Sequence, residues 1–132
     1  MSLLSGYNHN VTTVTFSDQA ADGSIGAFVA PFGGATVKAW YLLPELTVAS
    51  SDTNYYIVTL IDGGATGTAT TAIGTAAGSA AGVVANTKST GTLNTALDEL
   101  DAGDVLRIIY DEEGAVAPGE LTVVIEWAHG LG

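Results

Sequence analysis

The sequence predicts an all-β domain, an antiparallel β-sandwich of jelly-roll type with about eight strands. Three observations lead to this prediction. Gly, Ala and Thr are abundant while Glu and Lys are scarce, which disfavours helices. Short apolar runs recur along the chain, several with the two-residue period of a strand. Gly, Asp and Pro separate these runs, and these residues favour tight turns.

The first four strands are separated by clear turn and stop signals. Asp22 and Gly23 mark a turn before the second strand, and Gly33 and Gly34 mark the turn after it. The third run stops at Pro44, which cannot donate a hydrogen bond to a neighbouring strand. These expected strands cover residues 11–16, 24–30, 37–43 and 55–61.

Two runs, 55–61 and 105–110, are apolar on both alternating sets of side chains. Strands of this kind are usually buried on both faces. In a two-layer sandwich, a loop, an arm or a neighbouring subunit must then cover the second face. The run 121–127 alternates instead, and one face of it carries Leu121, Val123, Ile125 and Trp127.

The remaining segments carry weaker signals. Strands are expected at 67–75 and 85–93, although the first of these lies in a stretch made almost wholly of Gly, Ala, Thr and Ser. A single helical turn is expected within 95–101. Residues 1–10 have no period of their own and are expected to form an N-terminal arm, which leaves 11–132 as one β-sandwich domain.

Charge restricts the partners of this chain. Its 132 residues contain 14 Asp and Glu against 3 Lys and Arg, for a formal net charge of −11. Binding to nucleic acid needs cationic side chains, so it is not expected. No apolar run is long enough to span a membrane as a helix, and the N-terminus lacks the pattern of a signal peptide. We therefore expect a soluble protein that does not act at a membrane.

Residues suited to catalysis or metal binding are few. The chain has no Cys and only two His, His9 and His129, near opposite ends. It has no Gly-x-Ser-x-Gly motif. The sequence therefore predicts no enzyme, no cofactor and no metal site. Seven acids fall between Asp98 and Glu113, where solvated loops, Ca²⁺ binding and docking to a basic partner all remain open.

Aromatic residues form the most distinctive pattern on the strands. Trp40-Tyr41, Tyr55-Tyr56 and Trp127 offer rings for stacking on sugars, yet adjacent residues of a strand point to opposite faces. Packing in the core or in a subunit interface is the favoured interpretation. The residues predicted for a subunit interface are Trp40, Tyr55, Tyr56, Ile108 and Trp127.

Several segments in order along the chain resemble the head-decoration, or cement, proteins of tailed bacteriophages. Ala30-Pro31-Phe32 leads into residues 37–45, and Asp52-Thr53-Asn54 opens the strand at Tyr55. Residues 100–106 and the final strand after Ala117-Pro118-Gly119 continue the pattern. The long Gly/Ala/Thr stretch departs from it.

The resemblance implies a non-enzymatic virion protein. It implies a jelly-roll subunit that forms a homotrimer, binds the major capsid protein on the capsid exterior and stabilises the shell, after synthesis in the host cytoplasm. The alternative function is a carbohydrate-binding or adhesion module of a virion or cell surface.

Overall fold

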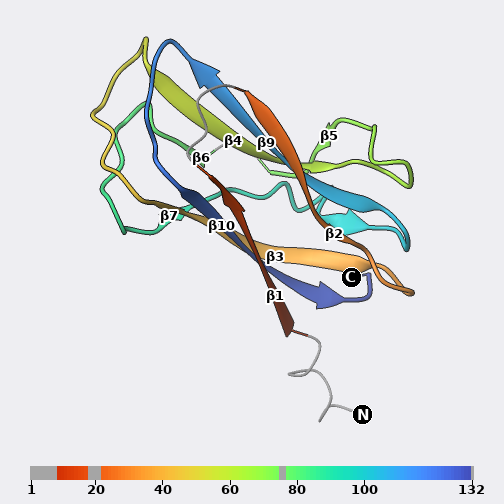
Figure 1. Ribbon diagram of the computed structural model, residues 1–132. Helices are drawn as coiled ribbons and strands as arrows, with labels where there is room; N and C mark the ends of the chain where they lie inside the picture. The colour runs from red at the N-terminus through yellow and green to blue at the C-terminus, as the bar shows by residue number, and fades with distance from the viewer. Residues whose placement is uncertain (1–8, 18–21, 75–76, 132) are drawn as a thin grey trace.

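The computed structural model describes residues 9–17, 22–74 and 77–131. Ten strands form two five-stranded antiparallel sheets that pack face to face (Figure 1), and these described ranges contain no helix. In the first sheet the order is β1-β10-β3-β7, and β8 also pairs with β3. In the second sheet the order is β2-β9-β4-β5, and β6 also pairs with β4.

Six of the strands are long and four are two-residue pairings. The bounds are β1 His9–Phe16, β2 Gly23–Val29, β3 Ala35–Pro44, β4 Tyr55–Asp62, β5 Thr71–Ala72, β6 Ala77–Gly78, β7 Ser89–Thr90, β8 Glu99–Leu100, β9 Val105–Glu113 and β10 Leu121–His129.

The order of pairing identifies the sandwich as a jelly roll. The first strand pairs with the last, β1 with β10, and the next pair inward is β2 with β9. Then β3 pairs with β7 and β8, and β4 pairs with β5 and β6. The chain is thus one long antiparallel ribbon wound into two sheets. Because β5 and β6 share one partner, as do β7 and β8, the ten strands occupy eight positions, which confirms the predicted fold.

The weakly signalled segments differ most from expectation. Within 67–75 and 85–93 only β5 and β7 form. The expected helical turn at 95–101 is wrong, because Leu97 N donates to Asn94 O at 2.9 Å in an isolated turn and Glu99–Leu100 then pairs with β3. Strand β1 begins at His9, two residues early. Residues 1–8 lie outside the described residues, so the N-terminal arm stays a prediction.

The core lies between the inner faces of the two sheets. On β4 the inner side chains are Tyr56, Val58 and Leu60, all with 0% exposure, while the outer side chains of β4 are mostly half-buried. Strand β9 shows the same alternation. The prediction that these strands are buried on both faces is therefore met only on the inner face. No further layer among the described residues covers the outer one.

Trp40 occupies the place where the first sheet is interrupted between β7 and β8. Its indole is fully buried, and Nε1 donates to Thr92 O at 2.9 Å. A Cβ at Gly91 would lie 2.0 Å from Trp40 Cε2, and one at Gly74 would lie 3.0 Å from Trp40 Nε1. Two glycines that carried little information in the sequence thus make room for the largest buried side chain.

Tyr56 brings an unsatisfied hydroxyl into the core. The ring stacks on Tyr110 with centroids 5.5 Å apart, and the Tyr56 hydroxyl has no hydrogen-bond partner among the described residues. Burial raises the pKa of Tyr56 to about 12. By contrast, the Tyr110 hydroxyl donates to Glu112 Oε1 at 2.8 Å.

Replacing Tyr56 with Phe is expected to raise the free energy of unfolding by about 1 kcal/mol, because an unsatisfied buried hydroxyl is removed. Urea unfolding followed by fluorescence measures the change. The matched control is Tyr110→Phe, which removes the hydrogen bond to Glu112 and should lower the free energy of unfolding. A loss of stability in Tyr56→Phe would mean that the hydroxyl is satisfied after all.

Candidate interaction surfaces

Three of the five residues predicted for a subunit interface lie in the core. Trp40, Tyr56 and Ile108 each have 0% exposure. A side chain without accessible surface cannot contact another subunit, so in this conformation these three stabilise the single subunit instead. Alternation in the sequence indicated that the strands have two apolar faces, but it could not say which face points inward.

The other two predicted interface residues, Tyr55 and Trp127, keep part of their surface. Tyr55 lies on β4 opposite Glu113 of β9. Trp127 stacks on Phe28 with ring centroids 4.7 Å apart, and its Nε1 donates to Thr12 Oγ1 at 3.0 Å. Both side chains are half-buried. Their role in an interface stays a prediction.

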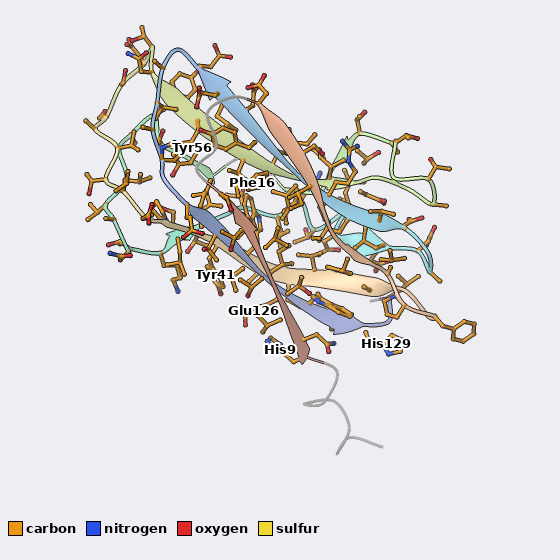
Figure 2. All side chains as sticks on the ribbon, viewed as in Figure 1. His9, Phe16, Tyr41, Tyr56, Glu126 and His129 are labelled. Atoms are coloured by element: carbon orange, nitrogen blue, oxygen red, sulfur yellow. The ribbon has the colours of Figure 1, made fainter. Side chains whose placement is uncertain are left out.

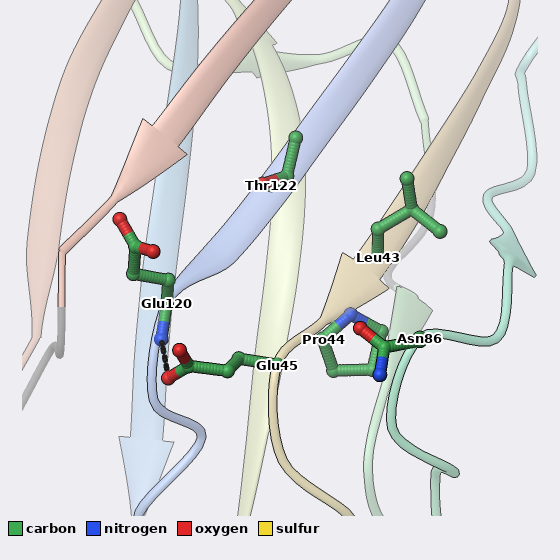
Figure 3. Close-up of a pocket in the computed structure, with 6 residues that line it drawn as sticks. All are labelled: Leu43, Pro44, Glu45, Asn86, Glu120 and Thr122. Atoms are coloured by element: carbon green, nitrogen blue, oxygen red, sulfur yellow. Dashed lines mark hydrogen bonds between the residues drawn. The ribbon is translucent and has the colours of Figure 1, made fainter.

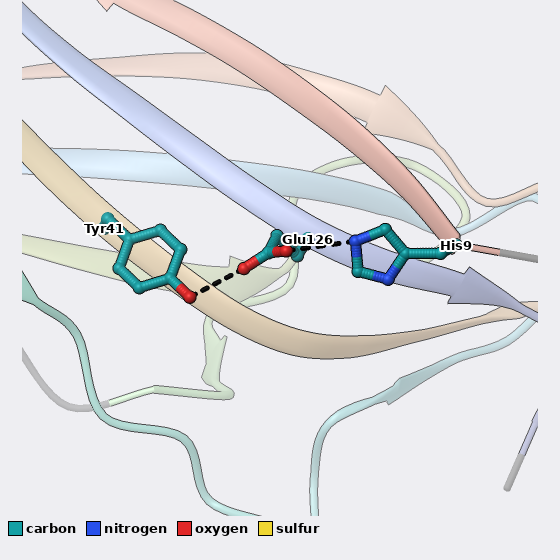
Figure 4. A network of polar contacts seen from close by, with 3 residues as sticks. All are labelled: His9, Tyr41 and Glu126. Atoms are coloured by element: carbon teal, nitrogen blue, oxygen red, sulfur yellow. Dashed lines mark hydrogen bonds and ion pairs between the residues drawn. The ribbon is translucent and has the colours of Figure 1, made fainter. Parts of the chain in front are cut away.

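A polar network crosses the outer face of the first sheet (Figure 4). Glu126 on β10 accepts a hydrogen bond from Tyr41 Oη on β3 at 2.6 Å, and its second oxygen lies 3.0 Å from His9 Nε2 on β1. Lys88 Nζ lies 4.5 Å from the centre of the Tyr41 ring. Figure 2 shows the three labelled residues together on these neighbouring strands. The network joins β1, β10 and β3 and places a carboxylate at the centre of the sheet face.

The hydrogen bond from Tyr41 lowers the pKa of Glu126, and His9 adds a smaller effect in the same direction. We expect Tyr41→Phe to raise the pKa of Glu126 toward its ordinary value. Because the pKa of Glu126 is lower in the folded state than in the unfolded state, the contact stabilises the protein at pH values above the unfolded-state pKa. That stabilisation is lost as the pH falls through the folded-state pKa of Glu126. Carboxyl carbon NMR titration measures the shift, with Tyr55→Phe as a control that leaves it unchanged. If the pKa of Glu126 is the same in Tyr41→Phe as in the native chain, the hydrogen bond from Tyr41 is not the cause of the lowered pKa.

Apolar side chains surround this network. Val11 on β1 is 57% exposed and Leu43 on β3 is 36% exposed, and Val124 on β10 lies between these strands. We call Val11, Leu43 and Val124 the first-sheet patch. The first-sheet patch therefore combines exposed and half-buried apolar side chains with one polar network on a single sheet face.

A second apolar group lies on or beside the β2–β3 turn. Phe32 is 95% exposed, Val29 is 61% exposed and Leu131 is 53% exposed. We call these three residues the loop-end patch. Phe32 lies in one of the segments that carry the resemblance to decoration proteins, but it is not among the predicted interface residues. The available signal was an apolar ring placed inside a turn, between Pro31 and Gly33-Gly34.

The seven acids of the sequence cluster separate into two groups. Four of them precede β9, and three lie at its far end within the strand. Nine extended residues span roughly 30 Å, so the groups do not form one site. Burial and neighbouring Asp62 raise the pKa of Asp104. No group of three or more His, Asp or Glu in the described part of the chain is placed to hold a metal ion. The first group comprises Asp98, Glu99, Asp101 and Asp104, and the second comprises Asp111, Glu112 and Glu113.

A hollow lies at the Pro44 end of β3 (Figure 3). It is an open depression of about 410 Å³. Two carboxylates line it, and Glu45 Oε1 accepts a hydrogen bond from the Glu120 backbone N at 3.1 Å. Its lining residues are Leu43, Pro44, Glu45, Asn86, Glu120 and Thr122.

Comparisons with known proteins identify no family for this chain. No protein-family model and no curated protein matches it. Among solved structures, a chain of the cyanophage Pam1 capsid asymmetric unit is 17% identical, with a TM-score of 0.45, covering 92% of this chain and 84% of that chain. A chain of infectious bursal disease virus, Gx strain, is 16% identical with a TM-score of 0.30, and the match spans only 38% of its length.

No described helix is long and apolar enough to cross a membrane.

Proposed function

We propose that this chain is a non-enzymatic structural protein of a virus particle, which decorates the outside of a phage head as a homotrimer and stabilises the shell. The observation that carries the proposal is the presence of two separate apolar surfaces on one small domain. The first-sheet patch and the loop-end patch lie on different parts of the molecule. A protein that contacts both its own copies and a shell needs two such surfaces.

The fold and the sequence pattern support the same proposal. A jelly roll is the subunit architecture that the resemblance to decoration proteins implies, and the described residues form one. The segments that carry the resemblance include Ala30-Pro31-Phe32, which supplies the most exposed aromatic side chain among the described residues. The net charge of −11 favours solubility of the free protein.

The proposed mechanism of stabilisation is avidity. A trimer carries three copies of one docking surface, so the second and third contacts form at a high effective concentration once the first has formed. Weak individual contacts then give tight attachment across neighbouring capsid subunits. The first-sheet patch is proposed to contact sibling subunits. Tyr55 lies on the second sheet and Trp127 packs on Phe28 between the two sheets, so a role of either residue in an interface would require a separate contact.

Two measurements test the proposal. Sedimentation velocity at micromolar concentration should give about three times the 13.3 kDa mass of one chain. Shells assembled from the major capsid protein of the same virus should bind the chain at saturable sites and resist heating better when it is bound. A monomer that leaves such shells undecorated would overturn the proposal. Saturable binding to one sugar class on a glycan array would favour the carbohydrate-binding alternative instead.

A further inference from the structure

The turn that carries Phe32 does not need an aromatic side chain for its own stability. Gly34 N donates to Pro31 O at 2.8 Å, and Gly33 has a φ of 92°, which together describe a type II turn with Phe32 at its second position. That position accepts most residues and favours Pro. The Phe32 ring is 95% exposed, so it gains nothing from the fold. The fold of the single subunit therefore does not require an aromatic ring at this position.

The turn is braced on the side of the first sheet. His129 Nε2 contacts Phe32 O, and Gly130 N donates to Gly34 O at 2.9 Å. Thr36 Oγ1 donates to Gly130 O at 2.8 Å, which fixes the end of β10 against β3. Figure 2 shows His129 at this end of the sandwich. The backbone beneath Phe32 is therefore held in place before any partner arrives.

The same turn is braced on its other side by the acidic turn that precedes β9. Ala30 N donates to Asp104 O at 2.8 Å, and Gly103 N donates to Ala30 O at 2.9 Å. A loop that is already held on both sides loses little further conformational entropy when its side chain binds a partner. Large rigid aromatic side chains on such loops are the typical anchors of protein interfaces.

Charge around the loop-end patch restricts what the patch can bind. Asp101 and Asp104 lie on the adjoining turn, and Asp62 lies close enough to Asp104 to raise its pKa. We call Asp62, Asp101 and Asp104 the acidic rim. Neither turn contains Lys or Arg, and the bases Lys38 and Arg107 lie on β3 and β9. One of them, Arg107, donates to Ser24 Oγ and Ala69 O.

We propose that Phe32 inserts into an apolar cleft of the capsid shell protein, and that Lys or Arg residues around that cleft pair with the acidic rim. This inference rests on the proposed function and assigns the surface that touches the shell. A second copy of the chain is a poor occupant, because it carries the same acids and only three Lys and Arg in all. Anionic lipid and nucleic acid would be repelled by the same rim.

The test compares variants for binding to shells that are assembled from the major capsid protein of the same virus and lack this chain. Phe32→Ser is expected to bind at least tenfold more weakly than the native chain. Its thermal unfolding should be unchanged, because the ring is 95% exposed. The matched control is Val84→Ser, which removes an apolar side chain of 61% exposure elsewhere and should bind like the native chain.

A second pair of measurements tests the charges. Raising the salt concentration should weaken binding of the native chain, and Asp101→Asn should both weaken binding and reduce that salt dependence. Binding that is insensitive to salt, with Asp101→Asn equal to the native chain, would overturn the assignment of a basic cleft.

The outcomes separate the inference from the function on which it rests. A native chain that does not bind the shells overturns the proposed function. A native chain that binds while Phe32→Ser binds equally well overturns only this inference. If Val84→Ser is as weak as Phe32→Ser, binding depends on general apolar exposure and the inference is also wrong. If Phe32→Ser lowers the sedimentation mass instead, the occupant of the patch is a sibling subunit, and the shell assignment is wrong.

Discussion

Trp40→Ala is expected to lower the free energy of unfolding by about 3 to 5 kcal/mol, a large share of the stability of a domain this size. The indole is fully buried between the sheets and its Nε1 donates to Thr92 O. The substitution removes both the packed ring and that hydrogen bond, and the bridge between β3 and the loop after β7 is lost with them. Urea unfolding followed by circular dichroism measures the effect.

Trp40→Phe provides a second variant if Trp40→Ala does not fold. It keeps most of the ring and loses the hydrogen bond, so its cost should lie clearly below that of Trp40→Ala. Val84→Ser, at an exposed position, should change the same quantity by less than about 0.5 kcal/mol. A Trp40→Ala variant as stable as Val84→Ser would show that the core does not depend on this ring.

Gly91→Ala is expected to destabilise the protein by about 3 kcal/mol, although it adds a single methyl group. The new Cβ would lie 2.0 Å from Trp40 Cε2 and 2.4 Å from Trp40 Cζ2, so the ring or the strand must move. Gly26→Ala is the matched control, because its Cβ would meet no atom closer than 3.9 Å. Chemical denaturation of the two variants gives the comparison.

The clash also predicts a strong coupling between the two positions. In the Trp40→Ala background the ring is absent, so adding Gly91→Ala should cost almost nothing further. A double-mutant cycle should therefore give a coupling energy of about 2 to 3 kcal/mol. Additive effects of the two substitutions would mean that the cost of Gly91→Ala comes from the backbone and not from the ring.

Much of the fold was predictable because its long strands carry local signals. The alternation from Leu121 to Trp127 indicated both the strand β10 and its inner face, and Leu121, Val123 and Ile125 are fully buried. The turn residues Asp22-Gly23 and Gly33-Gly34 likewise lie where strands begin and end. These features depend on neighbours in the chain, which is why the sequence alone indicates them.

The candidate interface was less predictable because it depends on residues far apart in the chain. Tyr55 and Tyr56 are chemically alike, and only the assembled sheet decides that Tyr56 points inward. The burial of Trp40 depends on Gly91 and Gly74, which are distant from it in sequence and identical to many other glycines. The exposure of Phe32 depends on bracing by the other end of the chain, through His129.

The pairing of the first strand with the last has a consequence for synthesis on the ribosome. Strand β10 lies between β1 and β3, so the first sheet stays without its central member until residues 121–129 have emerged. Until then β1 lacks its partner strand, and its apolar side chains stay unshielded. Closing so long a loop is slow, as in other sandwiches dominated by non-local pairing. A nascent chain stalled before residue 121 is therefore prone to aggregate, and emergence of residues 121–129 allows the first sheet to close.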